Sequence, residues 1–241
     1  MRIGTWNVEY AAGQEKNVRR RDILDHHNCD VWVLTETHDE LELTATHTAV
    51  HSAQRRTGRL GGRWASIWTR YPVLRQLETV DPRRTVAALV EAPLGALMIY
   101  GTVMPWASDR GDAEPGTPVR NWSELHRVVV QQGEEWAALR CRHPEADLCI
   151  AGDLNMNLGG KHYYGTAQSR RLLREAMAAS GLFCATAAER VPADALAHPP
   201  IDHVLLPAAW EARTEIVAAW EGKAGQGSRL SDHSGLAVAV S

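Results

Sequence analysis

The chain has 241 residues, of which 44% are hydrophobic and 23% charged, a composition that is typical of a globular protein. Its formal net charge at pH 7 is −3, which argues against a protein that holds nucleic acid mainly through many phosphate contacts, because such proteins usually carry a basic surplus. No apolar run approaches the ~18 residues that a membrane-spanning helix needs.

Short apolar runs with β-branched residues predict nine strands, and three longer amphipathic stretches predict helices. Several strands are apolar at consecutive positions, as strands covered on both faces are. In chain order, the predicted elements are strand 2–8, helix 15–28, strands 30–36, 64–69, 85–92 and 97–103, helix 122–141, strand 147–153, helix 168–180, and strands 201–207, 213–219 and 235–240.

The helix ends carry recognisable signals. Asn121 precedes the second helix as a plausible N-cap, and Glu124 follows three residues later in a capping-box pattern. Gly181 follows the third helix, where glycine is favoured after the last helical turn. Three consecutive arginines at 19–21 are interpreted as a solvated face of the first helix, and the arginines at 55, 56, 59 and 63 could form a local basic patch.

Nine strands with three helices are too many strands for a simple parallel doubly wound fold. Two sheets packed face to face, with helices outside, explain the doubly buried strands better, so we expect an α/β fold of this kind. No linker, repeat or low-complexity tract divides the chain, and we predict a single domain over residues 1–241. The loops 104–120 and 154–167 are candidates for functional segments.

The cellular compartment is predicted from two features. The opening segment MRIGTWNVEY lacks the charged and apolar regions of a signal peptide. The four cysteines show no CxxC spacing, so we expect buried free thiols in a reducing compartment in place of a disulfide framework or a zinc site. We therefore predict a cytoplasmic protein, and we expect it to be a monomer.

Polar residues stand at the ends of several predicted strands. One such residue is usually a turn former, but a series of carboxylate, amide and imidazole groups at separate strand ends is harder to explain by turns. In chain order they are Asn7 and Glu9, Glu36, Asp153 and Asn155, Asp202, and Ser231 with Asp232 and His233.

Carboxylates gathered at one rim repel one another unless a cation neutralises them, and oxygen ligands suit Mg²⁺ or Mn²⁺. With a histidine and an amide added, the set has the parts for hydrolysis of a phosphate ester. These parts are a metal that polarises a phosphoryl oxygen, a carboxylate that positions water, and donors for the charge of the transition state.

Five short motifs, in this order, resemble the endonuclease/exonuclease/phosphatase superfamily. The resemblance covers nearly the whole chain and implies a four-layered α/β sandwich that hydrolyses phosphate esters with a divalent metal. The motifs are TWNVE (5–9), LTE (34–36), GDLN (152–155), IDH (201–203) and SDH (231–233), and GRWASIWTRYPV (62–73) is similar to a further family segment.

The resemblance also implies a role for each matching residue on the metal side. Glu36 is then the principal Mg²⁺ ligand, and Asn7 beside it holds the metal or the phosphate. Asp232 is a further carboxylate on the metal side. Glu9 matches a position that acts at a second metal or through water.

The catalytic roles follow from the resemblance in the same way. Asp153 orients or deprotonates the attacking water, and the Asn155 amide holds a phosphate oxygen. His233 contacts the scissile phosphate and Asp202 orients it. A carboxylate on one ring nitrogen raises the imidazole pKa and fixes the ring, which gives this last pairing a physical basis.

One segment departs from the family pattern. Members usually have a His or Tyr after the middle strand, whereas here the segment reads YGTVMPW and places Thr102 or Val103 there. A residue that assists the leaving group is therefore missing or displaced. Three residues could substitute for it, namely Tyr100, His162 and Tyr163.

The leading hypothesis is a metal-dependent phosphoesterase, with a nuclease acting on DNA or RNA ahead because the WNVE form resembles the nuclease branch. A phosphatase or phosphodiesterase of a small-molecule or lipid-headgroup substrate is the alternative, and a non-catalytic binding member is a third. Trp106 and Trp122 could stack on a base or sugar. Trp122 begins a helix, which favours packing beneath the loop.

Overall fold

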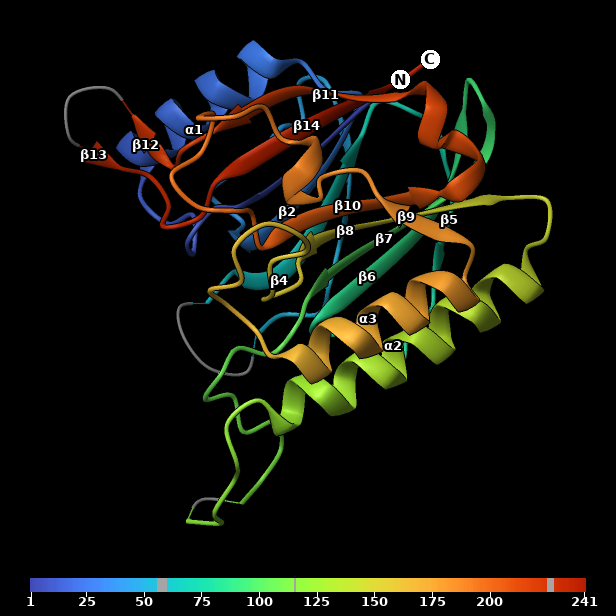
Figure 1. Ribbon diagram of the computed structural model, residues 1–241. Coiled ribbons are helices and arrows are strands. Elements are labelled where there is room, and N and C mark those ends of the chain that lie inside the picture. Colours follow the sequence, from blue (N-terminus) through green and yellow to red (C-terminus); the bar gives the residue numbers. More distant parts are fainter. Residues whose placement is uncertain (56–59, 115, 225–227) are drawn as a thin grey trace.

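The computed structural model describes residues 1–55, 60–114, 116–224 and 228–241, and two six-stranded sheets packed face to face form its centre (Figure 1). The first sheet has the order β11-β14-β1-β2-β4-β3. Its strands are β1 (Arg2–Asn7), β2 (Val31–His38), β3 (Thr48–His51), β4 (Gly62–Thr69), β11 (Thr214–Trp220) and β14 (Gly235–Val240).

The second sheet has the order β5-β6-β7-β8-β10-β9. Its strands are β5 (Val73–Leu77), β6 (Thr85–Ala92), β7 (Gly95–Val103), β8 (Asp147–Asp153), β9 (Leu182–Cys184) and β10 (Asp202–Pro207). Each sheet has one parallel pair at its centre, β1 with β2 and β7 with β8, and its other pairs are antiparallel. A short hairpin, β12 (Lys223–Ala224) and β13 (Ser228–Arg229), stands apart from both sheets.

Helices cover the outer face of each sheet and complete four layers (Figure 1). The long helices are α1 (Gln14–His27) over the first sheet, and α2 (Ser123–Arg142) and α3 (Ala167–Ala179) over the second. Two 3-10 turns, η1 (Ala188–Arg190) and η2 (Ala208–Arg213), flank β10 in the chain. Three separate apolar clusters fill the spaces between the layers, which confirms the predicted two-sheet α/β sandwich.

The innermost cluster explains the doubly buried strands. Val33 of the first sheet and Ile99 of the second both lie in it, completely buried. On the outer face of the first sheet, Trp32 packs against Gly4, where a Cβ atom would lie 2.1 Å from the indole ring. Alternate residues of one strand therefore fill two different cores, as the period of two requires.

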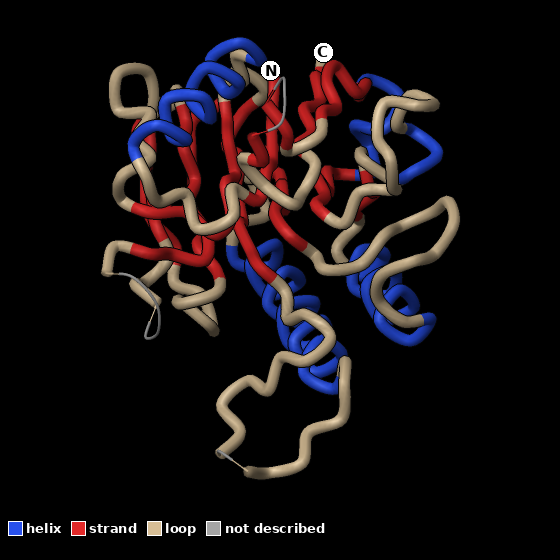
Figure 2. Tube along the Cα trace, turned by 90° about the vertical axis from the view of Figure 1, so that its left-hand side faces the viewer, coloured by secondary structure: helices blue, strands red, loops and turns tan. Residues whose placement is uncertain are grey.

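The nine predicted strands and three predicted helices are all present, with ends shifted by at most two residues. The strands β3, β5 and β9 and the short hairpin were not predicted. The connection between β7 and α2 extends away from the body of the protein (Figure 2). Of the described helices, none is long and apolar enough to cross a membrane.

Two helix predictions were wrong. The N-cap of α2 is Trp122, in a left-handed conformation with φ 68 and no side-chain cap bond, whereas Glu124 pairs with Arg127 at 2.6 Å. The capping box belongs to α3, where Thr166 and Ser169 satisfy each other's backbone N–H groups. Gly181 does follow α3, with φ +61.

Two further surface predictions need correction. Arg20 is buried and donates to the carbonyl of Leu230, so the arginines at 19–21 are not a wholly solvated face. All four cysteines are free, but Cys141 is exposed and only the other three are buried. Arg56 and Arg59 of the expected basic patch lie outside the described residues.

Candidate active site

The predicted site residues come together where strand ends of the two sheets meet. Asn7 ends β1 in the first sheet, and Asp153 ends β8 in the second. The Asn7 amide Nδ2 donates to Glu36 Oε1 and to Asp153 Oδ2, both at 3.2 Å. One amide group therefore links a carboxylate of each sheet.

The backbone at Glu36 directs its side chain into this group. Glu36 has φ 50, a left-handed conformation, and it falls between two regular pairs of β2 with β4, Thr35 with Ala65 and Thr37 with Arg63. A left-handed residue within a strand locally interrupts the pleat and re-aims the side chain. Such conformations are costly and occur where the surrounding structure holds them, often at functional sites.

Asp153 is almost completely buried and accepts several hydrogen bonds. The Asn155 backbone N–H donates to Asp153 Oδ1 at 2.9 Å, and the Asn155 amide donates to Oδ2 at 3.1 Å and to the carbonyl of Met104 at 2.7 Å. Burial raises the pKa of Asp153 to about 7, with the positive charge of His233 opposing and the negative charge of Asp202 assisting this shift. A carboxyl with such a pKa can exchange a proton near neutral pH.

Gly152, which precedes Asp153, allows the end of β8 to pack closely against β7. Gly152 has φ +134, and a Cβ atom there would lie 2.1 Å from the carbonyl oxygen of Thr102. Only glycine tolerates both the conformation and the close contact. The GDLN motif therefore owes its glycine to the packing of β8 against β7.

His233 and Asp202 form the second half of the site. His233 Nδ1 lies 2.6 Å from Asp202 Oδ2, and Nε2 lies 4.0 Å from Asp153 Oδ2. Burial lowers the pKa of His233, but the charges of Asp202 and Asp153 outweigh burial and raise it to about 10. The imidazole is therefore cationic at neutral pH and directs Nε2 toward Asp153.

Glu9 and Asp232 do not join the carboxylate group. Both side chains pair with Arg229, Glu9 at 2.5 Å and Asp232 at 3.4 Å. The prediction places both residues on the metal side, Glu9 at a second metal or through water, and in this structure both carboxylates are paired with Arg229. Glu9 instead donates its backbone N–H to Asn7 Oδ1 at 3.0 Å, which turns the Asn7 amide N–H groups toward the carboxylates.

The donor set fits a divalent cation. Carboxylate oxygens of Asp153 and Asp202 lie within 4.8 Å of each other beside His233, and Asp202 Oδ1 is buried with no hydrogen-bond partner among the described residues. Burial also raises the pKa of Glu36, across the shared amide from Asp153. Buried carboxylates that face one another in this way are stabilised when a cation with oxygen preference binds between them.

The three residues that could substitute for the missing His or Tyr lie in different places. Tyr100 is wrong, because its hydroxyl donates to Glu135 of α2 at 2.6 Å on the outer face of the sheet. His162 contacts the Asn157 amide at 3.3 Å. Tyr163 is half exposed, and burial together with the charges of Asp202 and Asp153 raises its pKa to about 12. Tyr163 is therefore the tyrosine of this set that lies beside the acidic group.

Three further residues lie beside the predicted ones. Burial and the Glu36 carboxylate raise the pKa of the Tyr10 hydroxyl, and the charge of Arg55 opposes the rise in pKa of both Tyr10 and Glu36. Ser231 donates from its hydroxyl to the Asn7 carbonyl at 2.5 Å and accepts from the backbone N–H of His233 at 3.0 Å. The SDH motif indicated Ser231 in the sequence, whereas Tyr10 and Arg55 carried no catalytic signal because they come from separate segments of the chain.

Comparison with known proteins agrees with the fold and identifies a family. The sequence model of the endonuclease/exonuclease/phosphatase family matches residues 4–233. No protein of curated function matches the sequence. Structures that are similar include the 3'-5' exonuclease of Neisseria meningitidis, with 16% identity and a TM-score of 0.69 over 100% of this chain and 99% of the other.

Two further structures show the same fold at low identity. An AP endonuclease from Archaeoglobus fulgidus is 14% identical with a TM-score of 0.66, and covers 100% of this chain and 99% of its own. Sphingomyelinase C from Streptomyces griseocarneus is 17% identical with a TM-score of 0.61 and the same coverage. The identities are too low to transfer a substrate.

Proposed function

The chain belongs to the endonuclease/exonuclease/phosphatase family, whose members are hydrolytic phosphoesterases, and we propose that this member is a Mg²⁺-dependent nuclease that cleaves phosphodiester bonds of DNA or RNA. The observation that carries the proposal is the shared amide of Asn7, which brings Glu36 and Asp153 together beside the pair of Asp202 and His233.

Glu36, which lies across the Asn7 amide from Asp153, would hold the cation. When bound, a divalent cation polarises a phosphoryl oxygen and offsets the negative charge that develops on it. Mg²⁺ would suit this group, because carboxylate oxygens and water are the ligands that it prefers. Mn²⁺ satisfies the same preference.

Asp153 takes the role of general base. Its carboxylate accepts a proton from the attacking water, and its raised pKa suits that transfer near neutral pH. Both N–H donors of Asn155 are used on Asp153 and Met104, so we assign Asn155 to the positioning of Asp153 and not to the phosphate. Asn7 positions the two carboxylates by the same reasoning.

His233 takes the role of the cationic contact to the scissile phosphate. Asp202 holds its Nδ1 side, which keeps the ring oriented and charged. The Nε2 side then faces Asp153 and the position of the substrate. Tyr163 is assigned to the leaving group, because the charges of Asp202 and Asp153 act on its hydroxyl.

The alternative function is a phosphatase or phosphodiesterase of a small-molecule or lipid-headgroup ester. The net charge of −3 favours this alternative, since a protein with a negative net charge does not attract a long polyanion electrostatically. We further propose a monomeric, single-domain, cytoplasmic enzyme; the free cysteines support the reducing compartment.

The test is nicking of supercoiled plasmid with Mg²⁺ or Mn²⁺, with EDTA and the Asp153→Ala protein as controls. Metal-dependent nicking that the variant lacks would support the nuclease. A protein that binds the metal but leaves plasmid and oligonucleotides intact, and hydrolyses a small phosphate ester, would establish the alternative. A protein that binds no metal would point to the non-catalytic hypothesis.

A further inference from the structure

Five side chains from separate segments form a continuous row of aromatic rings and guanidinium groups, which we call the stacked ladder. Its members are Tyr10, Arg55, Trp64, Arg84 and Trp106. The Arg55 guanidinium lies 4.4 Å from the ring centre of Tyr10 and 3.8 Å from that of Trp64. The Arg84 guanidinium lies 5.5 Å from Trp64 and 5.8 Å from Trp106, and the two indoles are 5.9 Å apart.

Both ends of the stacked ladder adjoin the phosphoesterase site. At one end, Tyr10 lies close enough to Glu36 for the charge of that carboxylate to help raise the pKa of the Tyr10 hydroxyl. At the other end, Met104 donates its backbone N–H to the Asp153 carbonyl at 2.8 Å and accepts from the Asn155 amide, two residues before Trp106. A ligand on the ladder would therefore lie next to the predicted site residues.

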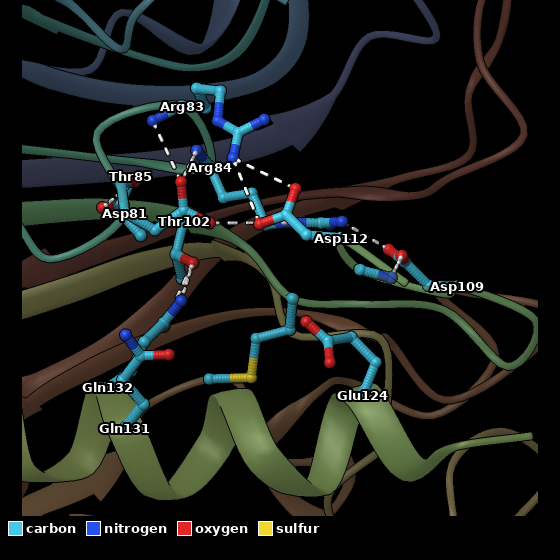
Figure 3. Close-up of polar contacts among 12 residues, drawn as sticks. Asp81, Arg83, Arg84, Thr85, Thr102, Asp109, Asp112, Glu124, Gln131 and Gln132 are labelled. Atoms are coloured by element: carbon cyan, nitrogen blue, oxygen red, sulfur yellow. Dashed lines mark hydrogen bonds and ion pairs between the residues drawn. The ribbon is translucent and has the colours of Figure 1, made fainter. Parts of the chain in front are cut away.

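Ion pairs fix the Trp106 end of the ladder in place. Arg84 pairs with Asp109 at 2.7 Å, and Arg83 pairs with Asp112 at 3.4 Å (Figure 3). These pairs tie the start of the connection between β7 and α2 to the turn before β6. The Trp106 ring is thus held before any ligand arrives, which reduces the entropy that binding would cost.

The two arginines of the ladder differ in their charge balance. Arg84 is neutralised by Asp109 and Asp81, whereas no ion pair of Arg55 occurs among the described residues. Arg55 Nε is also buried without an acceptor. Held between two rings and close to the site, Arg55 is a preformed cation for an anionic group such as a phosphate.

Two rings of the ladder remain available to a ligand. Trp106 is 36% exposed and Tyr10 is 49% exposed. An exposed ring next to a guanidinium matches the needs of a nucleotide, whose base stacks on the ring while its phosphate contacts the cation. Bases within a duplex have no free faces, so stacking of this kind requires unpaired bases.

We propose that the stacked ladder binds a single-stranded segment of nucleic acid next to the scissile phosphate. Arg55 contacts a phosphate, and Trp106 and Tyr10 stack on unpaired bases. This inference rests on the proposed function and deepens it, because it names unpaired strand as the form of nucleic acid that the site accepts.

The test measures binding of fluorescein-labelled oligonucleotides by anisotropy, in the Asp153→Asn background with Mg²⁺ so that cleavage does not interfere. Three ligands of equal length are compared: a single strand, its duplex, and a strand whose sugars carry no bases. The variants are Trp106→Leu, Trp106→Phe and Arg55→Gln, with Leu74→Ala as a control for an exposed apolar residue on a distant edge strand.

Trp106→Leu is expected to weaken binding of the base-bearing single strand by at least about fivefold and to leave binding of the base-free strand unchanged. Trp106→Phe retains a ring and is expected to restore most of the affinity. Arg55→Gln is expected to weaken binding of both strands by the same factor, because it removes a phosphate contact. Leu74→Ala is expected to bind as the parent protein does.

The proposal is overturned if Trp106→Leu binds the base-bearing strand as tightly as the parent, or loses equal affinity for both strands. Preference for the duplex, unaffected by Trp106→Leu, would also overturn it. Hydrolysis by the parent protein separates this failure from failure of the proposed function. If the protein hydrolyses phosphate esters with metal but its binding of single strands does not depend on the ladder, only the ladder proposal is overturned. If binding depends on the ladder but no nucleic acid is hydrolysed, the ladder proposal is supported and the proposed nuclease function is overturned.

Discussion

Asp202 and His233 are joined across the two sheets, with Asp202 Oδ2 of the second sheet 2.6 Å from Nδ1 of His233, which precedes the last strand of the first. On its other side, the His233 ring reaches Asn7, with Nε2 lying 3.5 Å from the Asn7 amide nitrogen. Its charge balance couples the stability of the folded protein to pH, since His233 holds its proton far above the ordinary pKa of 6.5.

We predict that the metal-free protein loses stability as pH rises. The native His233 has a pKa of about 10 against 6.5 ordinarily, so its contribution is full below pH 6.5 and is lost as pH approaches 10. Asp153, at about 7 against 3.8, acts in the same direction between pH 3.8 and 7. Urea unfolding in EDTA from pH 5 to 9 measures this slope. Asp202→Asn should flatten the slope above pH 6.5, and a stability that rose with pH would contradict the assignment.

We predict that Mg²⁺ stabilises the native protein and that Glu36→Gln abolishes this effect. A ligand at 100 times its dissociation constant adds about 2.7 kcal/mol when it binds only the folded state. Without metal, Glu36→Gln should unfold at the same temperature as the parent or higher, because burial already disfavours the charged carboxylate. Thermal unfolding with Mg²⁺ titration measures both effects. The exposed Glu91 of β6 provides the matched control, Glu91→Gln, which should respond to Mg²⁺ as the parent does.

We predict that Asp153→Ala lowers kcat by about 10²–10⁴, the usual contribution of a positioned general base, while the protein stays folded. Asn155→Ala should lower kcat less, because Asp153 keeps its bond to the backbone N–H of residue 155. Steady-state kinetics with the hydrolysed ester, together with circular dichroism, separates chemistry from folding. Asp153→Ala at the parental rate would remove Asp153 from the mechanism.

We predict opposite effects for substitutions of Tyr163 and Tyr100, one on catalysis and the other on stability. Tyr163→Phe should lower kcat with little change in stability, since its side chain is half exposed near Asp153 and Asp202. Tyr100→Phe should leave kcat unchanged and lower the free energy of unfolding by about 1–3 kcal/mol, because Glu135 loses a buried donor. Parallel kinetics and urea unfolding of both variants measure the difference. The reverse pattern would return the leaving-group role to Tyr100.

We predict that Glu9→Gln changes the metal titration less than Glu36→Gln does. Glu9 already pairs with Arg229, and its backbone N–H, which orients Asn7, survives the substitution. The Mg²⁺ dependence of thermal unfolding measures this. A loss of Mg²⁺ stabilisation equal to that of Glu36→Gln would restore Glu9 as a direct ligand.

The sequence by itself determined the nine main strands, the three helices and the sandwich, because burial on two faces leaves a local record in consecutive apolar residues. It also identified Asn7, Glu36, Asp153 and His233 as residues at strand ends. The short strands β3, β5 and β9 escaped prediction, since their few residues carry no clear period. That residues 1–241 form one domain stays a prediction.

Only the tertiary structure decided which of these side chains meet. The left-handed turn at Glu36 re-aims a carboxylate that strand alternation alone would misplace. Arg229 withdraws Glu9 from the group of carboxylates, and Tyr100 points to a helix and not to the site. The stacked ladder is assembled from five distant segments. Such contacts depend on where strand ends come to lie in space, and a local pattern of residues holds no record of that.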